Sequence, residues 1–173
     1  MTHLRITGWK HRRDLSLLAF KDWPWSGVNS LLRALAQAHI NLPFLLMQGG
    51  GGGVRIRLCL ERGQRLRAEA LAGDLAKEEG WPVPQVTEPV IALTFYPLAG
   101  GMTLPAEALA CLTGAGLRPL AVGTSLAAMT LILPEKMLPA AVRALGRRFD
   151  LPPGGLPPEE RVSVVQSPTP RES

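Results

Sequence analysis

Cysteine, aromatic residues and long apolar runs are all scarce in this 173-residue chain. The two cysteines, Cys59 and Cys111, stand far apart and form no CxxC pair, which excludes a disulfide framework and a thiolate metal site. We expect both to be small hydrophobes in a protein of the reducing cytoplasm. No apolar run is long enough to span a membrane, and residues 1–5 lack the features of a signal peptide.

Catalytic side chains are equally scarce. Histidine occurs only at His3, His11 and His39, and His39 falls at a predicted helix end. Nucleophilic catalysis needs a base beside serine or cysteine, and the sequence offers no such pair. We therefore expect a protein that is not an enzyme and that needs no cofactor.

Positive charge is in excess, because 19 Lys and Arg outnumber 14 Asp and Glu and give a formal net charge of +5. This balance permits nucleic-acid binding. The predicted strands 54–60 and 128–133, however, contain no aromatic residue on which a base could stack. The basic residues are also scattered over element ends and helix faces, at Arg12, Arg13, Arg62, Arg65, Arg67, Arg143, Arg147 and Arg148. Nucleic acid is therefore the third choice among the functions considered.

The sequence contains a tandem repeat of one small unit. Each copy is predicted to have the order strand, helix, strand, strand, helix, strand. The residues 15–20, 41–48, 54–60 and 83–86 read as the strands of the first copy, with prolines confining the last to an edge. Its helices are marked by Val28, Leu31, Leu32, Leu35 and Ala36, with Ser26 or Gly27 as the cap, and by Leu66, Ala70, Leu71 and Leu75, ending near Gly80.

The second copy follows without a long linker. Its predicted strands are 89–95, 117–122 and 128–133, and its predicted helices are 106–113 and 135–148. Residues 3–9 read as a short edge strand, 11–14 as a polar turn and 161–165 as a last strand. These first and last strands lie outside the two copies, which leaves open whether the copies exchange them.

This order predicts an α+β fold of two ferredoxin-like βαββαβ units, each an antiparallel sheet with helices on one face. We place the first unit at residues 1–87, the second at 88–166 and a disordered tail at 167–173. The five glycines at 49–53 would suit either a phosphate cradle or a hairpin. The hairpin is favoured, because neither Lys-Ser/Thr nor a helix follows them.

In each copy a polar or glycine-bearing loop joins the first strand to the first helix. The first amides of a helix have no internal partner, so such a loop suits a carboxylate. The first copy reads Asp22-Trp23-Pro24-Trp25-Ser26-Gly27, then Leu35-Ala36-Gln37-Ala38-His39-Ile40-Asn41, then Met47-Gln48-Gly49. The second reads Ala99-Gly100-Gly101-Met102, then Gly123-Thr124-Ser125, then Ala141-Val142-Arg143-Ala144-Leu145-Gly146-Arg147-Arg148-Phe149.

In this order the motifs resemble the regulatory region of aspartate kinase, a tandem ACT domain. That family reads D-x-P-G, L-A-x-A-x-I-N and Q-N in its first domain, and G-x-G-M, S-T-S and A-x-R-A-L-H-x-x-F in its second. The resemblance covers almost the whole chain but includes no kinase segment. It implies a regulatory module that binds an amino-acid-like ligand at an interface between ACT domains.

Carried over by position, the resemblance implies that Asp22 receives the ammonium group of the ligand. Gly27, Val28 and Asn29 would offer backbone amides, and Gln48 would contact the ligand from the second strand. Asn41 belongs to the same matched set. A zwitterion needs such an acceptor and such amides whatever the family.

Several departures separate this chain from the family pattern. Two residues are inserted between Asp22 and Gly27, and Gly49 replaces the asparagine after Gln48. The two tryptophans around Pro24 fit either a ligand wall or an exposed interface. The first loop of the second copy is shortened, so we expect the second copy to be structural.

Two functions remain ahead of nucleic-acid binding. The leading one is a homodimeric regulator that binds an amino-acid-like ligand and acts on a biosynthetic enzyme. The alternative is a degenerate ACT scaffold that mediates assembly without a ligand.

Overall fold

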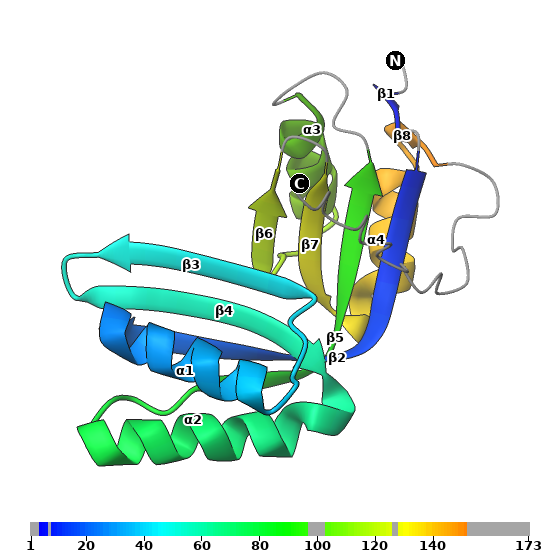
Figure 1. The fold of residues 1–173 in the computed structure, drawn as a ribbon. Coiled ribbons are helices and arrows are strands. Elements are labelled where there is room, and N and C mark those ends of the chain that lie inside the picture. The colour runs from blue at the N-terminus through cyan, green and yellow to red at the C-terminus, as the bar shows by residue number, and fades with distance from the viewer. Residues whose placement is uncertain (1–3, 7, 97–102, 126–127, 152–173) are drawn as a thin grey trace, which may run out of the picture.

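Strands from both copies join into one six-stranded antiparallel sheet with the order β3-β4-β2-β5-β7-β6 (Figure 1). The computed structural model describes residues 4–6, 8–96, 103–125 and 128–151. Within these residues the strands of this sheet are β2 (Gly8–Trp23), β3 (Phe44–Gly50), β4 (Gly53–Glu61), β5 (Gln85–Tyr96), β6 (Ala121–Thr124) and β7 (Met129–Pro134). A separate parallel pair joins β1 (Leu4–Arg5) to β8 (Phe149–Asp150). The predicted α+β class is confirmed, although the two units share a single sheet.

The sheet is shared because β2 and β5 each run through both copies. The first part of β2 pairs with β5 from Gly8 opposite Tyr96, and its later part pairs with β4 from Leu15 opposite Glu61. Residues 8–12 therefore take the place of a fourth strand in the second unit. The strand predicted at 161–165 and the tail at 167–173 lie outside the described residues.

One prediction about these long strands was wrong. Residues 11–14 form no turn but continue β2, which bends at Asp14 (φ 56°), where the register with β5 shifts. Aspartate tolerates this left-handed conformation better than most residues, so the strand bends without ending. The strand predicted at 83–86 corresponds to the start of β5 at Gln85, and it forms an edge as expected, because residues 85–87 pair with β2 whereas β7 pairs with β5 only from Val90 to Phe95. Pro82 and Pro84 precede it and so remove no hydrogen bond from the ladder.

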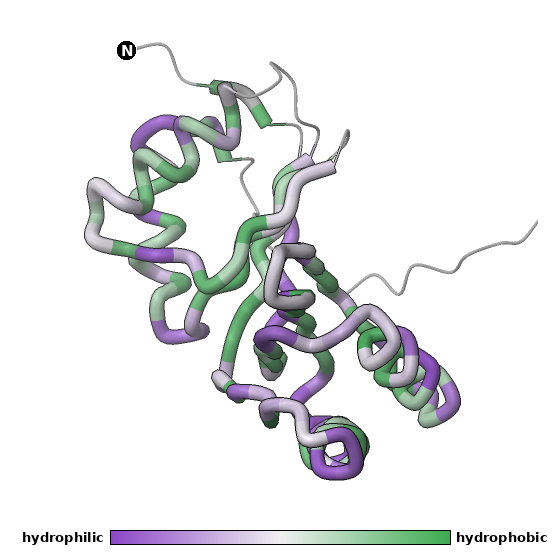
Figure 2. Tube along the Cα trace, turned by 90° about the vertical axis from the view of Figure 1, so that its left-hand side faces the viewer, coloured by the Kyte–Doolittle hydropathy of each residue, from purple (hydrophilic) through white to green (hydrophobic). Residues whose placement is uncertain are grey.

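The described residues contain four α-helices: α1 (Trp25–Gln37), α2 (Arg65–Glu79), α3 (Thr103–Gly114) and α4 (Leu138–Leu145). Short 3₁₀ turns, η1 (Arg62–Gln64) and η2 (Glu135–Met137), precede α2 and α4, so the last helix is shorter than predicted. Along the helices, hydrophobic and hydrophilic stretches alternate (Figure 2). None of these helices is both long and apolar enough to cross a membrane.

The first helix buries Val28, Leu31 and Leu35, as its spacing predicted. Its cap was predicted wrongly: Pro24 occupies that position, and no side chain caps the helix. The residues that mark α2 in the sequence are only partly inward. Leu71 and Leu75 pack at the margin of the core, whereas Leu66 is 70% exposed. The fully buried side chains are Ala68, Ala72 and Ala76, whose small size allows close packing of α2 on its neighbours. The helix ends at Glu79, close to the predicted end, and Gly80 follows it in the left-handed conformation.

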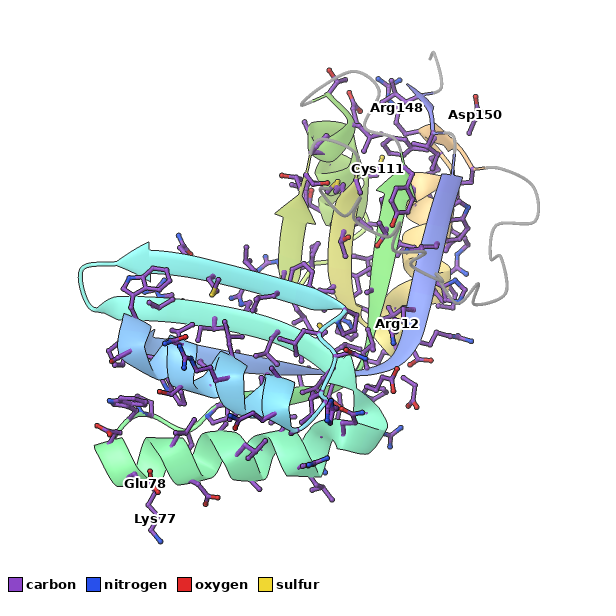
Figure 3. The ribbon with its side chains drawn as sticks, in the orientation of Figure 1. Arg12, Lys77, Glu78, Cys111, Arg148 and Asp150 are labelled. Carbon is purple, nitrogen blue, oxygen red and sulfur yellow. The ribbon has the colours of Figure 1, made fainter. Side chains whose placement is uncertain are left out.

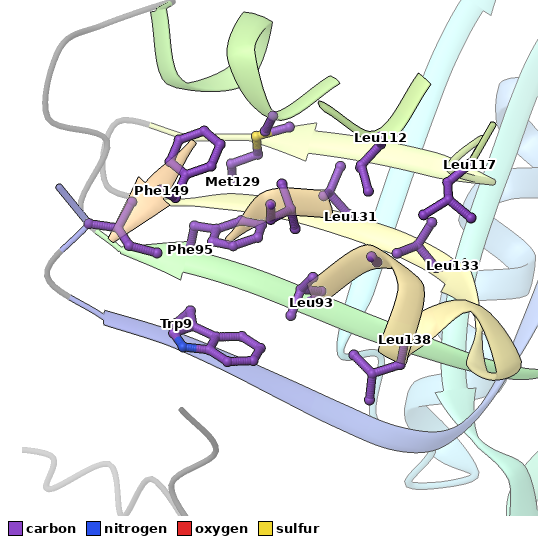
Figure 4. Close-up of a cluster of buried hydrophobic side chains, with 14 of the residues drawn as sticks. Trp9, Leu93, Phe95, Leu112, Leu117, Met129, Leu131, Leu133, Leu138 and Phe149 are labelled. Atoms are coloured by element: carbon purple, nitrogen blue, oxygen red, sulfur yellow. The ribbon is translucent and has the colours of Figure 1, made fainter. Parts of the chain in front are cut away.

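All four helices pack on the same side of the bent sheet. One core lies between α3, α4 and strand residues that include Trp9, Leu93, Phe95 and Leu131 (Figure 4). A second core lies between α1, α2 and strand residues that include Phe20, Ile56 and Leu58. The side of the sheet without helices is concave at its bend.

A third core closes this bend, where the two halves of the sheet meet. It contains Leu17, Phe44 and Cys59 from the first unit and Ala121 and Ile132 from the second. Around the bend, Arg12 pairs with Glu61 at 2.6 Å (Figure 3), and further ion pairs join Arg13 to Glu135 and Arg62 to Asp14. The halves of the sheet are therefore held together by apolar packing inside and by charge pairs at the rim.

Candidate functional site

Two of the predicted site residues, Asp22 and Gln48, line one surface cavity of about 210 Å³. Asp22 comes from the end of β2 and Gln48 from β3. The remaining walls are the glycines of the β3–β4 hairpin, Gly49–Gly53, and Arg55 of β4. Both side chains are exposed to solvent, so a small polar molecule can reach them.

Asp22 is held at the cavity by an irregularity in β2. The pairing of β2 with β4 shifts between Phe20 and Trp23, and Asp22 has a φ of 57°. A Cβ at Gly52 would stand 3.5 Å from Oδ1 of Asp22, which puts the carboxylate beside the glycine turn. A strand without this irregularity would continue its alternation and direct Asp22 differently.

The glycine run forms the hairpin that the sequence favoured, with β3 ending at Gly50 and β4 starting at Gly53. Gly53 has a φ of 126°, and a Cβ there would approach the carbonyl carbon of Asp22 to 2.8 Å. Glycine is required at this position both by the backbone conformation and by the close approach. The hairpin thus packs directly on the backbone that carries Asp22.

Gly27, Val28 and Asn29 lie in the first turns of α1 and do not line this cavity. A Cβ at Gly27 would lie 2.5 Å from the indole of Trp81, so packing explains this glycine. The amide of Val28 already donates to the carbonyl oxygen of Pro24 at 3.1 Å. The Nε of Arg33 donates to Oδ1 of Asn29 at 3.4 Å.

Asn41 is exposed between α1 and β3 and also lies outside the cavity.

The two tryptophans around Pro24 have different environments. Trp23 is fully buried, donates from Nε1 to the carbonyl oxygen of Pro82 at 2.8 Å and packs against Trp81. Trp23 therefore belongs to the core. Trp25 is 62% exposed, and a Cβ at Gly49 would touch its ring at 3.4 Å, so Trp25 stands beside the cavity.

A larger groove of about 420 Å³ shares Asp22, Gln48 and Arg55 with this cavity. It extends over the concave side of the sheet, where Lys21 and Arg57 also line it. Arg55 and Arg57 stand at alternate positions of the strand predicted at 54–60, and no sequence motif includes them. Their spacing of two residues in a strand was the signal that could have singled them out.

Other reactive groups in the described residues offer no competing site. No three His, Cys, Asp or Glu side chains gather there as a metal site would require. Burial raises the pKa of the Cys59 thiol to about 12, so this thiol stays protonated. Cys111 is half-buried on α3 near Glu107 and Arg148 (Figure 3), and burial, followed by the charge of Glu107, raises its pKa.

The second copy presents a different surface. Its first loop, residues 99–102, lies outside the described residues. Gly123, from the Gly123-Thr124-Ser125 motif, packs against the ring of Phe44 in the first unit, where a Cβ would approach to 2.9 Å. This residue of the motif therefore contributes to the contact between the two halves of the sheet.

Comparison with known proteins identifies the fold. No family model matches the chain, and no curated protein matches it in sequence. The ligand-free regulatory subunit of aspartate kinase from Thermus thermophilus matches with a TM-score of 0.73 at 18% identity, covering 84% of this chain and 99% of that chain. Aspartate kinase from Synechocystis matches with a TM-score of 0.77 at 17% identity, covering 91% of this chain and 28% of that chain.

Aspartate kinase from Clostridium acetobutylicum matches with a TM-score of 0.71 at 11% identity, covering 87% of this chain and 36% of that chain. At such low identity the likeness shows the fold alone. The chain has the tandem ACT fold of the regulatory subunit of aspartate kinase, as its motifs predicted.

Proposed function

We propose that this protein is a non-catalytic regulator that binds a small amino-acid-like ligand at the cavity beside Asp22 and Gln48. The observation that carries the proposal is the convergence of these two side chains with the glycine hairpin in one cavity. They come from different strands, separated by a helix, and the resemblance to the aspartate kinase family assigns both to the ligand from their sequence positions alone.

The chemistry of the cavity suits a zwitterion. The carboxylate of Asp22 accepts from an ammonium group, and the guanidinium of Arg55 donates to a carboxylate. The amide side chain of Gln48 can do either, because it has both donors and an acceptor. Charge-assisted hydrogen bonds are the stronger kind, so a few of them suffice to hold a small ligand.

A homodimer is part of the proposal. The cavity adjoins β3, an edge strand of the sheet, on which Leu45 and Met47 are 38% and 40% exposed. Unpaired edges with apolar side chains favour association with another strand. A second copy on this edge would place the ligand at an interface between ACT domains, and a biosynthetic enzyme is the proposed target of regulation.

A thermal-shift screen against the twenty amino acids tests the binding. A ligand at a hundredfold its Kd adds about 2.7 kcal/mol to the free energy of unfolding. For a chain of this size we expect the Tm to rise by roughly 5 to 10 °C. Asp22→Asn should remove the shift, because it removes the charge while keeping a side chain that tolerates the local φ. Asp74→Asn, at an exposed position on α2 away from the cavity, is the matched control and should keep the shift.

A shift that persists in Asp22→Asn would overturn the assigned site. No shift with any amino acid would favour the scaffold without ligand. That alternative predicts a dimer whose dissociation does not change when amino acids are added. Sedimentation at decreasing protein concentration measures this dissociation.

A further inference from the structure

We propose that the ligand carries a second anionic group, as an amino acid with an acidic side chain does, and that Lys21 and Arg57 hold this group while Arg55 holds the α-carboxylate. This inference rests on the proposed function and specifies the ligand class of the same site. It follows from the larger groove, which continues from the Asp22 cavity over the concave side of the sheet.

The register of the strands sets these residues side by side. Arg57 of β4 is paired with Leu46 of β3 and with Ala19 of β2, and Gln48 is paired with Arg55. Arg55 and Arg57 are two positions apart on one strand, so they share a face with their Cα atoms about 7 Å apart. Lys21 lies two positions beyond Ala19, which puts it on the same side next to Arg55.

Polarity changes abruptly along this face. The neighbouring cross-strand row nearer the bend is apolar and consists of Phe44, Cys59 and Leu17, all buried in the core that closes the bend. The groove begins one row further out, at Arg57. A groove with one low-dielectric wall strengthens the field of its charges compared with an open surface.

The charge of the groove exceeds what a simple zwitterion requires. Lys21, Arg55 and Arg57 contribute three positive charges, and Asp22 contributes one negative charge. One cation balances an α-carboxylate, and Asp22 balances the ammonium group. Two cations are then left, and a second carboxylate on the ligand is the group that they would bind.

Lys21 and Arg55 differ from several arginines in the described part of the chain, because those arginines are paired with acidic residues. Arg12, Arg65 and Arg148 each pair with a glutamate within 4.0 Å. Among the described residues, neither Lys21 nor Arg55 has a carboxylate within that distance. Arg67 is also unpaired, but it stands on the outer surface of α2 and lines neither cavity.

Arg57 is positioned by the second unit. Its Nη1 donates to the carbonyl oxygen of Leu120 at 2.7 Å, across the concave side of the sheet. A guanidinium has five N–H donors, so this bond leaves others for a ligand. An arginine already held in place loses less conformational entropy when it binds an anion.

Isothermal titration with two matched ligand pairs, L-glutamate against L-glutamine and L-aspartate against L-asparagine, tests the inference. Within each pair only the side-chain charge differs, so the ratio of the two Kd values isolates the second carboxylate. In the wild-type protein we expect the acid of one pair to bind at least about tenfold more tightly than its amide. Lys21→Gln should reduce this ratio to below about threefold, whereas Arg55→Gln should weaken the binding of acid and amide alike, because both carry the α-carboxylate.

Arg67→Gln is the control, because it makes the same change in net charge outside the groove and should leave the ratio unchanged. Equal binding of acid and amide, with both lost in Asp22→Asn, would overturn this inference and leave the proposed function standing. No binding of any amino acid would overturn both. Tight binding of a random single-stranded oligonucleotide that Arg55→Gln abolishes would also overturn it, since the groove would then serve a polyanion.

Discussion

Gly27→Ala tests whether contact with Trp81 requires a glycine near the start of α1. The position lies inside α1, where alanine ordinarily stabilises a helix by about 1 kcal/mol relative to glycine. Here the added Cβ would lie 2.5 and 2.6 Å from two ring atoms of Trp81. That indole is itself packed against the buried Trp23, with ring centroids 5.0 Å apart. Overpacking of this kind costs about 1 to 3 kcal/mol, so the two effects oppose each other.

The matched control is Gly73→Ala in α2. This glycine is also inside a helix, and a Cβ there would meet nothing within 4 Å, so only the helix propensity changes. We expect Gly73→Ala to raise the free energy of unfolding by up to about 1 kcal/mol. The difference between the two variants is then the overpacking alone, about 1 to 3 kcal/mol.

Thermal and denaturant unfolding measure this difference. For a chain of this size 1 kcal/mol corresponds to roughly 2 to 4 °C in Tm, so the two variants should separate by several degrees. Tryptophan fluorescence provides a second readout, because relief of the contact requires a shift of the Trp81 ring, which packs against Trp23. If Gly27→Ala proves as stable as Gly73→Ala, the packing explanation of Gly27 is wrong.

Three further predictions concern other close contacts and the buried thiol. Gly53→Ala should lower the free energy of unfolding by about 3 kcal/mol or more, because its Cβ would press on backbone atoms at 2.8 and 2.9 Å and its φ is 126°. Gly51→Ala is the control: its Cβ would meet nothing within 4 Å, so denaturant unfolding should show almost no change in stability. Gly123→Ala should cost about 1 kcal/mol because its Cβ would lie 2.9 Å from the ring of Phe44, and a double-mutant cycle should show that Phe44→Leu relieves part of this cost. The folded protein binds the Cys59 proton more tightly than the unfolded chain, since burial raises the pKa from 9.0 to about 12. Stability should therefore fall as the pH rises from 9 towards 12, and a Cys59→Ala variant that keeps the same slope in urea titrations would contradict this assignment.

Local patterns in the sequence determined most of the elements. Val54, Ile56 and Leu58 alternate with other residues along the predicted strand 54–60 and lie in one core, because successive side chains of a strand point to opposite faces. The 3.6-residue spacing of Val28, Leu31 and Leu35 likewise identified the buried face of α1. Gly80 marked the end of α2, because helices commonly end with a glycine in the left-handed conformation. The motif order was enough to predict the tandem ACT fold.

Tertiary contacts decided what these local patterns left open. Nothing local shows that β2 continues through 11–14, because the pairing partner of that segment is β5, far along the chain. The inward face of α2 depended on how closely its neighbours approach, and its alanines are uninformative until that distance is known.

The candidate site was likewise determined partly by the sequence and partly by tertiary contacts. Residue types and motif positions pointed to Asp22 and Gln48, because their chemistry and order along the chain suffice for that. Which groups stand beside them depended on the irregularity at the end of β2, the hairpin and the strand register, which bring Lys21, Arg55 and Arg57 to the same groove. Only the folded sheet makes neighbours of residues that are distant in sequence, so the basic groove is a property of the tertiary structure.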